Sequence, residues 1–209
     1  MGFQFNGEGL IPVIAQDYKT GEIRMLAYAN EEAIKKTIET GYAHYFSRSR
    51  NKIWKKGETS GELQKVREIR IDCDKDTLLY IIEQEKNVAC HTGNRNCFYR
   101  DIEEKEVDHI LPFETLQRLE EIIRKRIEEK KEDSYTYKLF LQGKDRILQK
   151  FGEEAVESLI ALKNGDKNSI KEEVADMIYH LILAIVVNDL SITDIMEELS
   201  DRIKAGGKR

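Results

Sequence analysis

Residues 101–112, DIEEKEVDHILP, divide this chain into two parts with different hydrophobic patterns. Its first eight residues, 101–108, are charged and mostly acidic and form the expected linker, with the domain boundary near residue 110. Pro112, one of two prolines in the 209 residues, follows them. Before it, apolar and polar residues alternate over short runs, which is typical of strands. After it, apolar residues recur at helical spacing and no proline occurs. The sequence therefore predicts two domains, residues 1–110 and 111–209, joined by this linker.

The first domain is predicted to be small, β-rich and of the α+β class. Its first two strands flank a turn signal, Lys19-Thr20-Gly21. Asn30 stands before two glutamates, which indicates a helix N-cap, and the helix is expected to end at Gly41. Around Trp54 a polar loop is expected. The predicted strands are residues 11–15, 23–28, 43–48, 66–73, 78–82 and 97–99.

The second domain is predicted to be an all-α helical bundle, because it has helical periodicity throughout and no strand alternation. Turns are expected at Asn164-Gly165 and around Asn188-Asp189. The helices are expected at residues 113–130, 135–162, 169–187 and 192–204. On the second of these helices, the predicted apolar face consists of Leu148, Phe151, Ala155, Leu159 and Leu162.

Composition excludes several classes of protein. The chain holds 34 Lys+Arg against 39 Asp+Glu, a net charge of −5, and neither half is basic, so no nucleic-acid partner is expected. No segment has the length and apolarity of a membrane span, and the N-terminus lacks the pattern of a signal peptide. Three cysteines, an odd number, argue for reduced thiols. We expect a cytoplasmic protein.

The three cysteines fall within a short part of the first domain: Cys73, Cys90 and Cys97. Thiolates are soft ligands that suit Zn²⁺, and three of them leave the fourth tetrahedral position for a catalytic water. His91, adjacent to a possible ligand, is a candidate to move protons. The spacing contains no C-x2-C motif, so buried cysteines without a metal, and a surface histidine without a role, stay open as alternatives.

Asp72, Asp74 and Asp76 flank Cys73 at a period of two residues. On an extended segment their carboxylates would share one face, and Cys73 would point to the other. Hard oxygen ligands of this kind suit Mg²⁺. A solvated acidic loop is the alternative interpretation.

The second domain contains two pairs of acidic residues at i, i+3 spacing: Glu154 with Glu157, and Glu173 with Asp176. Each pair is expected to face one side of its helix, so that two helices together can hold Mg²⁺ for phosphoanhydride hydrolysis. Residues 174–187 are apolar on nearly every side, which predicts that Asp176 and His180 are buried. A solvated helix face remains the alternative for the first pair.

Five motifs of the first domain resemble phosphoribosyl-AMP cyclohydrolase: MLAYAN (25–30), YFSRSR (45–50), WKKGETSG (54–61), DCDKD (72–76) and CHTGNRNCF (90–98). The match covers residues 8–100. It implies a compact homodimer in which Cys73 of one subunit and Cys90 and Cys97 of the other bind zinc, with Mg²⁺ at the three aspartates. Ala29 and Asn96 depart from the residues that are common in the family, and neither is an expected ligand.

The resemblance implies a hydrolytic ring opening. Zinc-bound hydroxide attacks C6 of the N1-ribosylated adenine of phosphoribosyl-AMP, the N1–C6 bond breaks, and His91 moves the proton. The product is the phosphoribosyl-formimino carboxamide ribotide. A solvated basic face would explain any single cation of this domain equally well. The residues expected to bind the substrate are Arg48, Arg50, Lys56, Glu58, Ser60 and Arg67.

The second domain resembles phosphoribosyl-ATP pyrophosphatase, of the all-α nucleotide pyrophosphohydrolase group, over residues 113–205. The resemblance lies in SYT (134–136), GEEA (152–155) and the E-x-x-E and E-x-x-D pairs. It implies that helices of two chains build the site and that Lys138 and Lys150 meet substrate phosphates. The catalytic and magnesium-binding residues would be Glu154, Glu157, Glu173 and Asp176.

Three other functions fit the sequence less well. A deaminase fused to a helical dimerisation domain predicts H-x-E and P-C-x-x-C motifs, which the sequence lacks. A general nucleotide pyrophosphohydrolase with a structural zinc domain leaves the aspartates without a role. A zinc-binding interaction module requires four protein ligands that fill every coordination position of the metal. The bifunctional enzyme also explains the pairing of domains, because the second would supply the substrate of the first.

Overall fold

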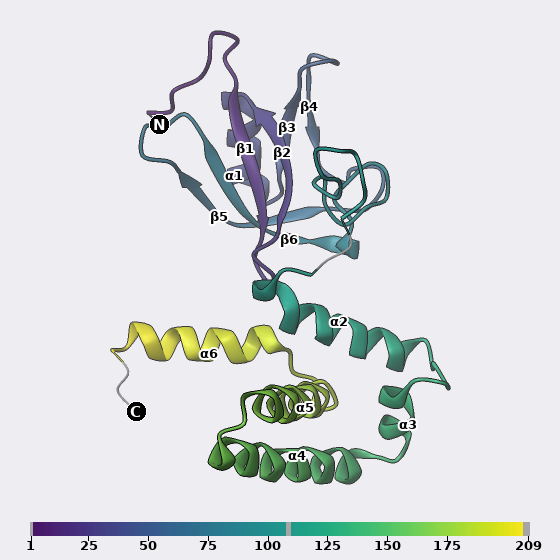
Figure 1. Cartoon of the computed structure of the whole chain (residues 1–209). Coiled ribbons are helices and arrows are strands. Elements are labelled where there is room, and N and C mark those ends of the chain that lie inside the picture. Colours follow the sequence, from purple (N-terminus) through teal and green to yellow (C-terminus); the bar gives the residue numbers. More distant parts are fainter. Residues whose placement is uncertain (1, 108–109, 207–209) are drawn as a thin grey trace. The chain divides into compact units, whose positions relative to one another are not determined.

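The computed structural model describes residues 2–107 and 110–206. The chain forms two compact units, Met1–Phe113 and Glu114–Arg209, each with its own hydrophobic core (Figure 1). The expected succession of a β-rich α+β fold and an all-α fold is confirmed. Asp108, the last residue of the expected linker, lies outside the described residues. Among the described helices, none is long and apolar enough to span a bilayer.

Within the described residues, the N-terminal unit is built on a six-stranded sheet in the order β4-β3-β2-β1-β6-β5 (Figure 1). Neighbouring strands are antiparallel except β1 and β6, which run parallel with Val13 opposite Leu78. The strands are β1 (Ile11–Asp17), β2 (Ile23–Ala29), β3 (His44–Ser47), β4 (Lys52–Lys55), β5 (Gln64–Ile71) and β6 (Leu78–Gln84).

One helix covers part of this sheet. Helix α1 (Glu31–Thr40) begins after Asn30, whose side chain accepts a hydrogen bond from the backbone N–H of Ala33, and it ends at Gly41 with φ of 72°. Its apolar side packs against β2, β3 and β4. Every second residue of β1 is buried, so the sheet directs one face into the core. A short 3-10 helix, η1 (Glu85–Asn87), follows β6.

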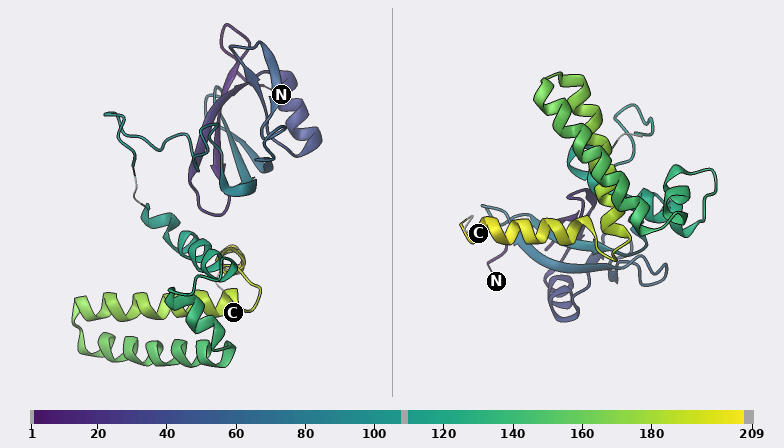
Figure 2. Two further views of the ribbon diagram at one scale, coloured as in Figure 1. Left: turned by 90° about the vertical axis from the view of Figure 1, so that its right-hand side faces the viewer. Right: turned by 90° about the horizontal axis from the view of Figure 1, so that it is seen from below.

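The C-terminal unit consists of helices. A 3-10 turn, η2 (Pro112–Glu114), leads into the first of them. In both views of Figure 2 the two longest, α4 and α5, lie side by side. Gly165, with φ of 78°, ends α4, and Asp166 caps α5, so the two helices form a hairpin. The described α-helices are α2 (Thr115–Glu128), α3 (Tyr135–Leu141), α4 (Lys144–Asn164), α5 (Lys167–Val186) and α6 (Ile192–Lys204).

Three expected elements are wrong. The single helix at residues 135–162 is two helices, α3 and α4, because Gly143 adopts φ of 93° between them. Trp54 lies in β4 and not in a loop. It pairs with Tyr45 of β3, and the centroids of the two rings lie 5.2 Å apart. Residues 97–99 form no strand.

The predicted apolar face of α4 is largely exposed in the single chain. Leu148, Leu159 and Leu162 are 44%, 66% and 55% exposed. A different side of the helix is buried, with Ile147, Glu154, Ser158 and Ala161. The core of the unit needs only that side, so the apolar stripe stays available for a second protein surface.

Candidate functional sites in the two units

Two of the three cysteines lie together in the loop after η1. The thiols of Cys90 and Cys97 interact directly, and the Thr92 hydroxyl donates a hydrogen bond to Cys90 Sγ at 3.0 Å. Burial and the neighbouring Cys90 raise the pKa of Cys97 to about 11. Burial also disfavours the Cys90 thiolate, but hydrogen bonds from Thr92 and Cys97 outweigh it and lower the pKa of Cys90. This pair suits a thiophilic cation, which would deprotonate both sulfurs.

The third cysteine lies elsewhere. Cys73 is exposed in the turn after β5. Within residues 2–107 and 110–206, no third cysteine, histidine or acidic ligand joins Cys90 and Cys97 closely enough to complete a metal site. His91 is exposed beside the pair, with Nδ1 3.9 Å from Cys90 Sγ. One chain therefore has two thiols at one place and the third at another.

A buried network of charged side chains holds the cysteine loop against the β1–β2 hairpin. Arg24 is 1% exposed and pairs with Asp17 at 2.9 Å and Glu22 at 3.0 Å. Arg95, from the cysteine loop, also pairs with Glu22. The backbone N–H of Cys97 donates to the Arg24 carbonyl at 2.8 Å. None of these charged residues was expected at the site. The feature of the sequence that could have indicated them is Arg24, a charged residue at a core-facing position of an otherwise apolar strand.

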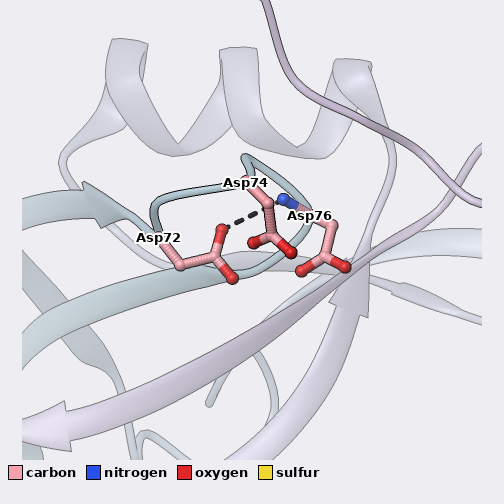
Figure 3. A group of neighbouring side chains, drawn as sticks. All are labelled: Asp72, Asp74 and Asp76. Atoms are coloured by element: carbon pink, nitrogen blue, oxygen red, sulfur yellow. Dashed lines mark hydrogen bonds between the residues drawn. The ribbon is translucent and has the colours of Figure 1, made fainter.

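Asp72, Asp74 and Asp76 come together on the turn between β5 and β6 (Figure 3). Each offers a carboxylate oxygen within 4.8 Å of the others, and all three are exposed. The expected extended segment is wrong, because Asp72 Oδ1 accepts the backbone N–H of Asp76 at 3.0 Å and Lys75 adopts φ of 65°. The turn itself gathers the carboxylates into a group that can hold a cation.

Arg48 and Arg50 line a pocket of about 880 Å³. Tyr28 and Trp54, which were not among the expected substrate residues, line it as well. The guanidinium carbon of Arg48 lies 4.1 Å from the ring centroid of Tyr28. An arginine stacked on an aromatic ring is held in place while its N–H groups remain directed at other partners. The pocket therefore combines two cations with the aromatic surfaces of Tyr28, Phe46 and Trp54.

The other expected binding residues of this unit are not among those that line this pocket. Lys56 is buried, pairs with Glu62 at 3.5 Å, and its charge acts on the thiols of Cys90 and Cys97. Lys56 therefore supports the thiolates. Arg67 donates through Nε to a carboxylate oxygen of Glu83 at 2.6 Å. The expected residues Glu58 and Ser60 are exposed in the turn after β4.

Three carboxylates of α4 and α5 offer oxygens within 4.8 Å of one another: Glu154, Glu157 and Glu173. Glu154 is only 7% exposed, so the solvated-face alternative is wrong for this residue. Burial and the charges of Glu157, Glu154 and Asp176 raise the pKa of Glu173 above its usual value. Lys150 Nζ lies 2.7 Å from Glu154 Oε1. The remaining repulsion among the carboxylates is what a divalent cation would relieve.

Asp176 is exposed, so its expected burial is wrong. The residues that α5 buries all lie in its C-terminal half, beginning with His180, and the half that carries Asp176 is less enclosed. His180 Nδ1 donates to the Asp176 carbonyl at 2.9 Å, and Nε2 accepts from the Tyr135 hydroxyl at 3.1 Å. Asp176, His180 and Glu154 share a pocket of about 420 Å³.

Three residues that were not expected also line this second pocket: Arg126, Tyr135 and Tyr179. The two residues expected to bind phosphate, Lys138 and Lys150, are not among the residues that line this pocket. Lys150 is held by Glu153 and Glu154, whose hydrogen bonds raise its pKa well above the usual value, and Lys138 is exposed on α3.

Comparison with known proteins identifies both units. Residues 25–99 match the family model of phosphoribosyl-AMP cyclohydrolase, and residues 116–203 match that of phosphoribosyl-ATP pyrophosphohydrolase. The histidine biosynthesis bifunctional protein HisIE of Aquifex aeolicus (strain VF5) is 66% identical over 201 residues, which cover 96% of this chain and 98% of the relative. The chain belongs to the HisIE family.

Other HisIE proteins agree over nearly the same length. That of Pyrococcus furiosus is 51% identical, covering 94% of this chain and 92% of the relative, and that of Thermotoga maritima is 50% identical, covering 93% and 98%. This HisIE-family chain is a bifunctional hydrolase of histidine biosynthesis, and its substrates are phosphoribosyl nucleotides. The C-terminal unit hydrolyses phosphoribosyl-ATP to phosphoribosyl-AMP and pyrophosphate, and the N-terminal unit opens the adenine ring of that product.

Proposed function

We propose that the cyclohydrolase site forms between two copies of the chain, where Cys90 and Cys97 of one protomer and Cys73 of the partner subunit hold a zinc ion. The observation that carries this proposal is the separation of donors, since two thiols lie together and the third lies on a different turn and does not join them. The donor set fits zinc because thiolates are its preferred ligands. Zinc bound there would supply Lewis acidity and lower the pKa of a bound water.

Residues of the chain carry the other parts of the ring opening. Water oxygen bonds to C6 of the purine, the N1–C6 bond breaks, one water proton ends on N1, and the other ends on the exocyclic nitrogen of the new carboxamide. His91, exposed beside Cys90, would move the proton that ends on N1. Arg48 and Arg50 would bind phosphate in their pocket, where Tyr28 holds the Arg48 guanidinium. Glu58, Ser60 and Arg67 remain candidates for contacts with the same nucleotide.

A second proposal concerns magnesium. The turn carboxylates of Asp72, Asp74 and Asp76 offer a hard, exposed ligand group that fits Mg²⁺ beside the cyclohydrolase chemistry. In the C-terminal unit, Glu154, Glu157 and Glu173 would hold Mg²⁺ together with Asp176.

In the pyrophosphohydrolase site, bound Mg²⁺ would neutralise phosphate charge and orient the attacking water. The carboxylates of α4 and α5 position that cation because successive helical turns place them on facing sides. Lys150 holds Glu154 in place through its ammonium group, and Lys138 is a candidate for the distal phosphates. Water attacks the α-phosphorus, and the bond to the bridging oxygen breaks to release pyrophosphate.

We propose further that the catalytic domains comprise residues 1–110 and 111–209, that the protein is a homodimer, and that it acts in the cytoplasm. The exposed apolar stripe of α4 supports dimerisation, because a surface of this kind on a helix is usually covered by a partner.

The two sites are tested in one coupled assay, with phosphoribosyl-ATP, Mg²⁺ and Zn²⁺ supplied and with separate detection of pyrophosphate and of the ring-opened product. Glu154→Gln should lose pyrophosphate release and still open added phosphoribosyl-AMP. Cys90→Ala should show the opposite. If either variant loses both activities or neither, the assignment of its site is wrong.

The shared zinc site is tested by mixing inactive chains. Cys73→Ser and Cys90→Ser should each lose the cyclohydrolase activity. Their co-expression should restore about a quarter of the wild-type activity, because half of the dimers are mixed and each mixed dimer has one intact site. No recovery, with mixed dimers demonstrated by differential tags, would show that each chain builds its own site.

A further inference from the structure

Arg126, near the end of α2, faces the pyrophosphohydrolase pocket and has no carboxylate partner among the residues that the structure describes. The other arginines of the same helix do have one: Arg118 pairs with Glu121 and Arg124 pairs with Glu120. Arg126 is half-buried, so its charge is only partly solvated. A cation in this position, on the wall of a pocket, is suited to an anion that enters the pocket.

Within the part of the chain that the structure describes, one hydrogen bond holds the guanidinium of Arg126. Arg126 Nη1 donates to Thr136 Oγ1 at 3.2 Å, and Thr136 Oγ1 in turn lies 2.8 Å from the Tyr179 hydroxyl. Thr136 is fully buried, so this anchor cannot move freely. The contact occupies a single N–H of the five that a guanidinium carries, and the others remain available as a planar fork for phosphate oxygens.

The same pocket carries Glu154 and Asp176, two of the proposed magnesium ligands. A metal held by carboxylates and an arginine on another wall can bind one phosphate chain together. Lys150 is a weaker candidate for this role because two carboxylates already bind it. The SYT motif at residues 134–136 also acquires a role here, since its threonine orients the arginine and its tyrosine contacts His180.

We propose that Arg126 binds a phosphate group of phosphoribosyl-ATP directly, and that Thr136 is the residue that positions its guanidinium. The proposal rests on the assignment of the pyrophosphohydrolase site to the carboxylates of α4 and α5. It extends that site to α2 and to the start of α3, which contribute no carboxylate to it.

The test compares Arg126→Ala and Arg126→Lys with Lys125→Ala, which removes a neighbouring, exposed cation of the same helix. Loss of a charged hydrogen bond to phosphate should lower kcat/KM for phosphoribosyl-ATP by about 10- to 100-fold in Arg126→Ala. Arg126→Lys keeps the charge without the fork and should lose less, whereas Lys125→Ala should match the wild type. Thermal unfolding of each variant checks that the helical bundle is folded. If Arg126→Ala is unfolded, the kcat/KM of Arg126→Lys serves as the test in its place.

Product inhibition then identifies the phosphate. A raised inhibition constant for inorganic pyrophosphate places Arg126 at the leaving end of the triphosphate, and a raised constant for phosphoribosyl-AMP places it at the retained nucleotide. Either result supports the proposal. Unchanged KM and unchanged inhibition constants in a folded Arg126→Ala protein would overturn it.

The positioning role of Thr136 has its own readout. Thr136→Val removes the hydroxyl at nearly constant volume and should raise the same inhibition constant as Arg126→Ala, by a smaller factor. Thr136→Ser keeps the hydroxyl, so its inhibition constant should be that of the wild type. Equal inhibition constants in Thr136→Val and Thr136→Ser would contradict the role of Thr136 in positioning Arg126. Glu154→Gln run in parallel separates the hypotheses, because full turnover in that variant would refute the carboxylate site whatever Arg126 does.

Discussion

The two units place their candidate sites on different kinds of backbone. In the cyclohydrolase unit, the thiols and aspartates lie on a loop and a turn beyond the ends of strands. In the pyrophosphohydrolase unit, the carboxylates lie on successive turns of α4 and α5. A helix fixes its side chains by its own hydrogen bonds, whereas a loop must be held by contacts with other elements. We therefore expect the first site to depend on distant supporting residues and the second to depend mainly on its own helices.

The largest effect should come from Arg24→Met, which breaks the network that supports the cysteine loop. Asp17 would remain buried without its cation and Glu22 would keep only Arg95, a loss that costs about 3–5 kcal/mol of unfolding free energy. Zinc content and ring opening should fall while pyrophosphate release continues. Denaturant unfolding, metal analysis and the two assays measure this. Lys35→Met, which removes an exposed helix pair with Glu31, is the control and should be close to neutral. Full zinc content in Arg24→Met would show that the loop needs no such tether.

A smaller loss is expected for Gly57→Ala, in the turn that follows β4. Gly57 adopts φ of 76°, and an added Cβ would lie 2.3 Å from the backbone carbon of Glu62. Strain of this kind costs about 1–3 kcal/mol. Ring opening should fall as well, because the turn positions the buried Lys56 near the thiols. Unfolding in urea, compared with the cyclohydrolase rate, gives both quantities. A variant as stable and active as wild type would place the turn outside the supporting structure.

Gly152→Ala should have the opposite sign. Gly152 lies inside α4, and nothing lies within 4 Å of the position of an added Cβ. Alanine should stabilise the helix by about 0.5–1 kcal/mol and leave pyrophosphate release unchanged. Thermal unfolding and the pyrophosphate assay are sufficient. A loss of activity without a loss of stability would sharpen the comparison, because it would mean that substrate or a second chain approaches the helix at this glycine.

The smallest effect is expected on the thermal stability of the Glu173→Gln variant, measured without metal. Burial and neighbouring carboxylates raise the pKa of Glu173, so the folded protein binds this proton more tightly than the unfolded chain does. The ionised residue therefore destabilises the fold at neutral pH, and the glutamine variant should have a slightly higher Tm in EDTA. The difference should shrink as the pH falls through the raised pKa. Added Mg²⁺ should stabilise the wild type more than the variant, and equal responses would argue against a metal ligand here.

Much of this organisation follows from the sequence. Helical periodicity and the absence of proline predict the bundle, and the i, i+3 spacing of Glu154 and Glu157 predicts that both face one way. Burial was assigned less well. Glu154 is buried although the sequence left a solvated helix face open as an alternative, and Asp176 is exposed, contrary to its expected burial. Periodicity shows which residues share a face, but the packing of other helices decides which face is covered.

The site on the loop and the turn follows less directly from the sequence. A period of two suggested a strand for Asp72 and its neighbours, and a turn with Lys75 at positive φ gathers them instead. Arg24 and Arg126 were missed for a common reason. Their importance depends on partners that lie on other elements of the fold, such as Arg95 and Thr136, and no local pattern reports such pairs.

The parallel pairing of β1 with β6 also bears on how the chain folds. Val13 pairs with Leu78, so β1 is an open edge until β6 has been synthesised and inserted between β1 and β5. Long-range pairing of this kind is slow, and an apolar edge strand is prone to intermolecular association until its partner strand has paired with it. The α4–α5 hairpin needs only neighbouring residues. The half of the protein that leaves the ribosome first should therefore be the half at greater risk of aggregation during synthesis.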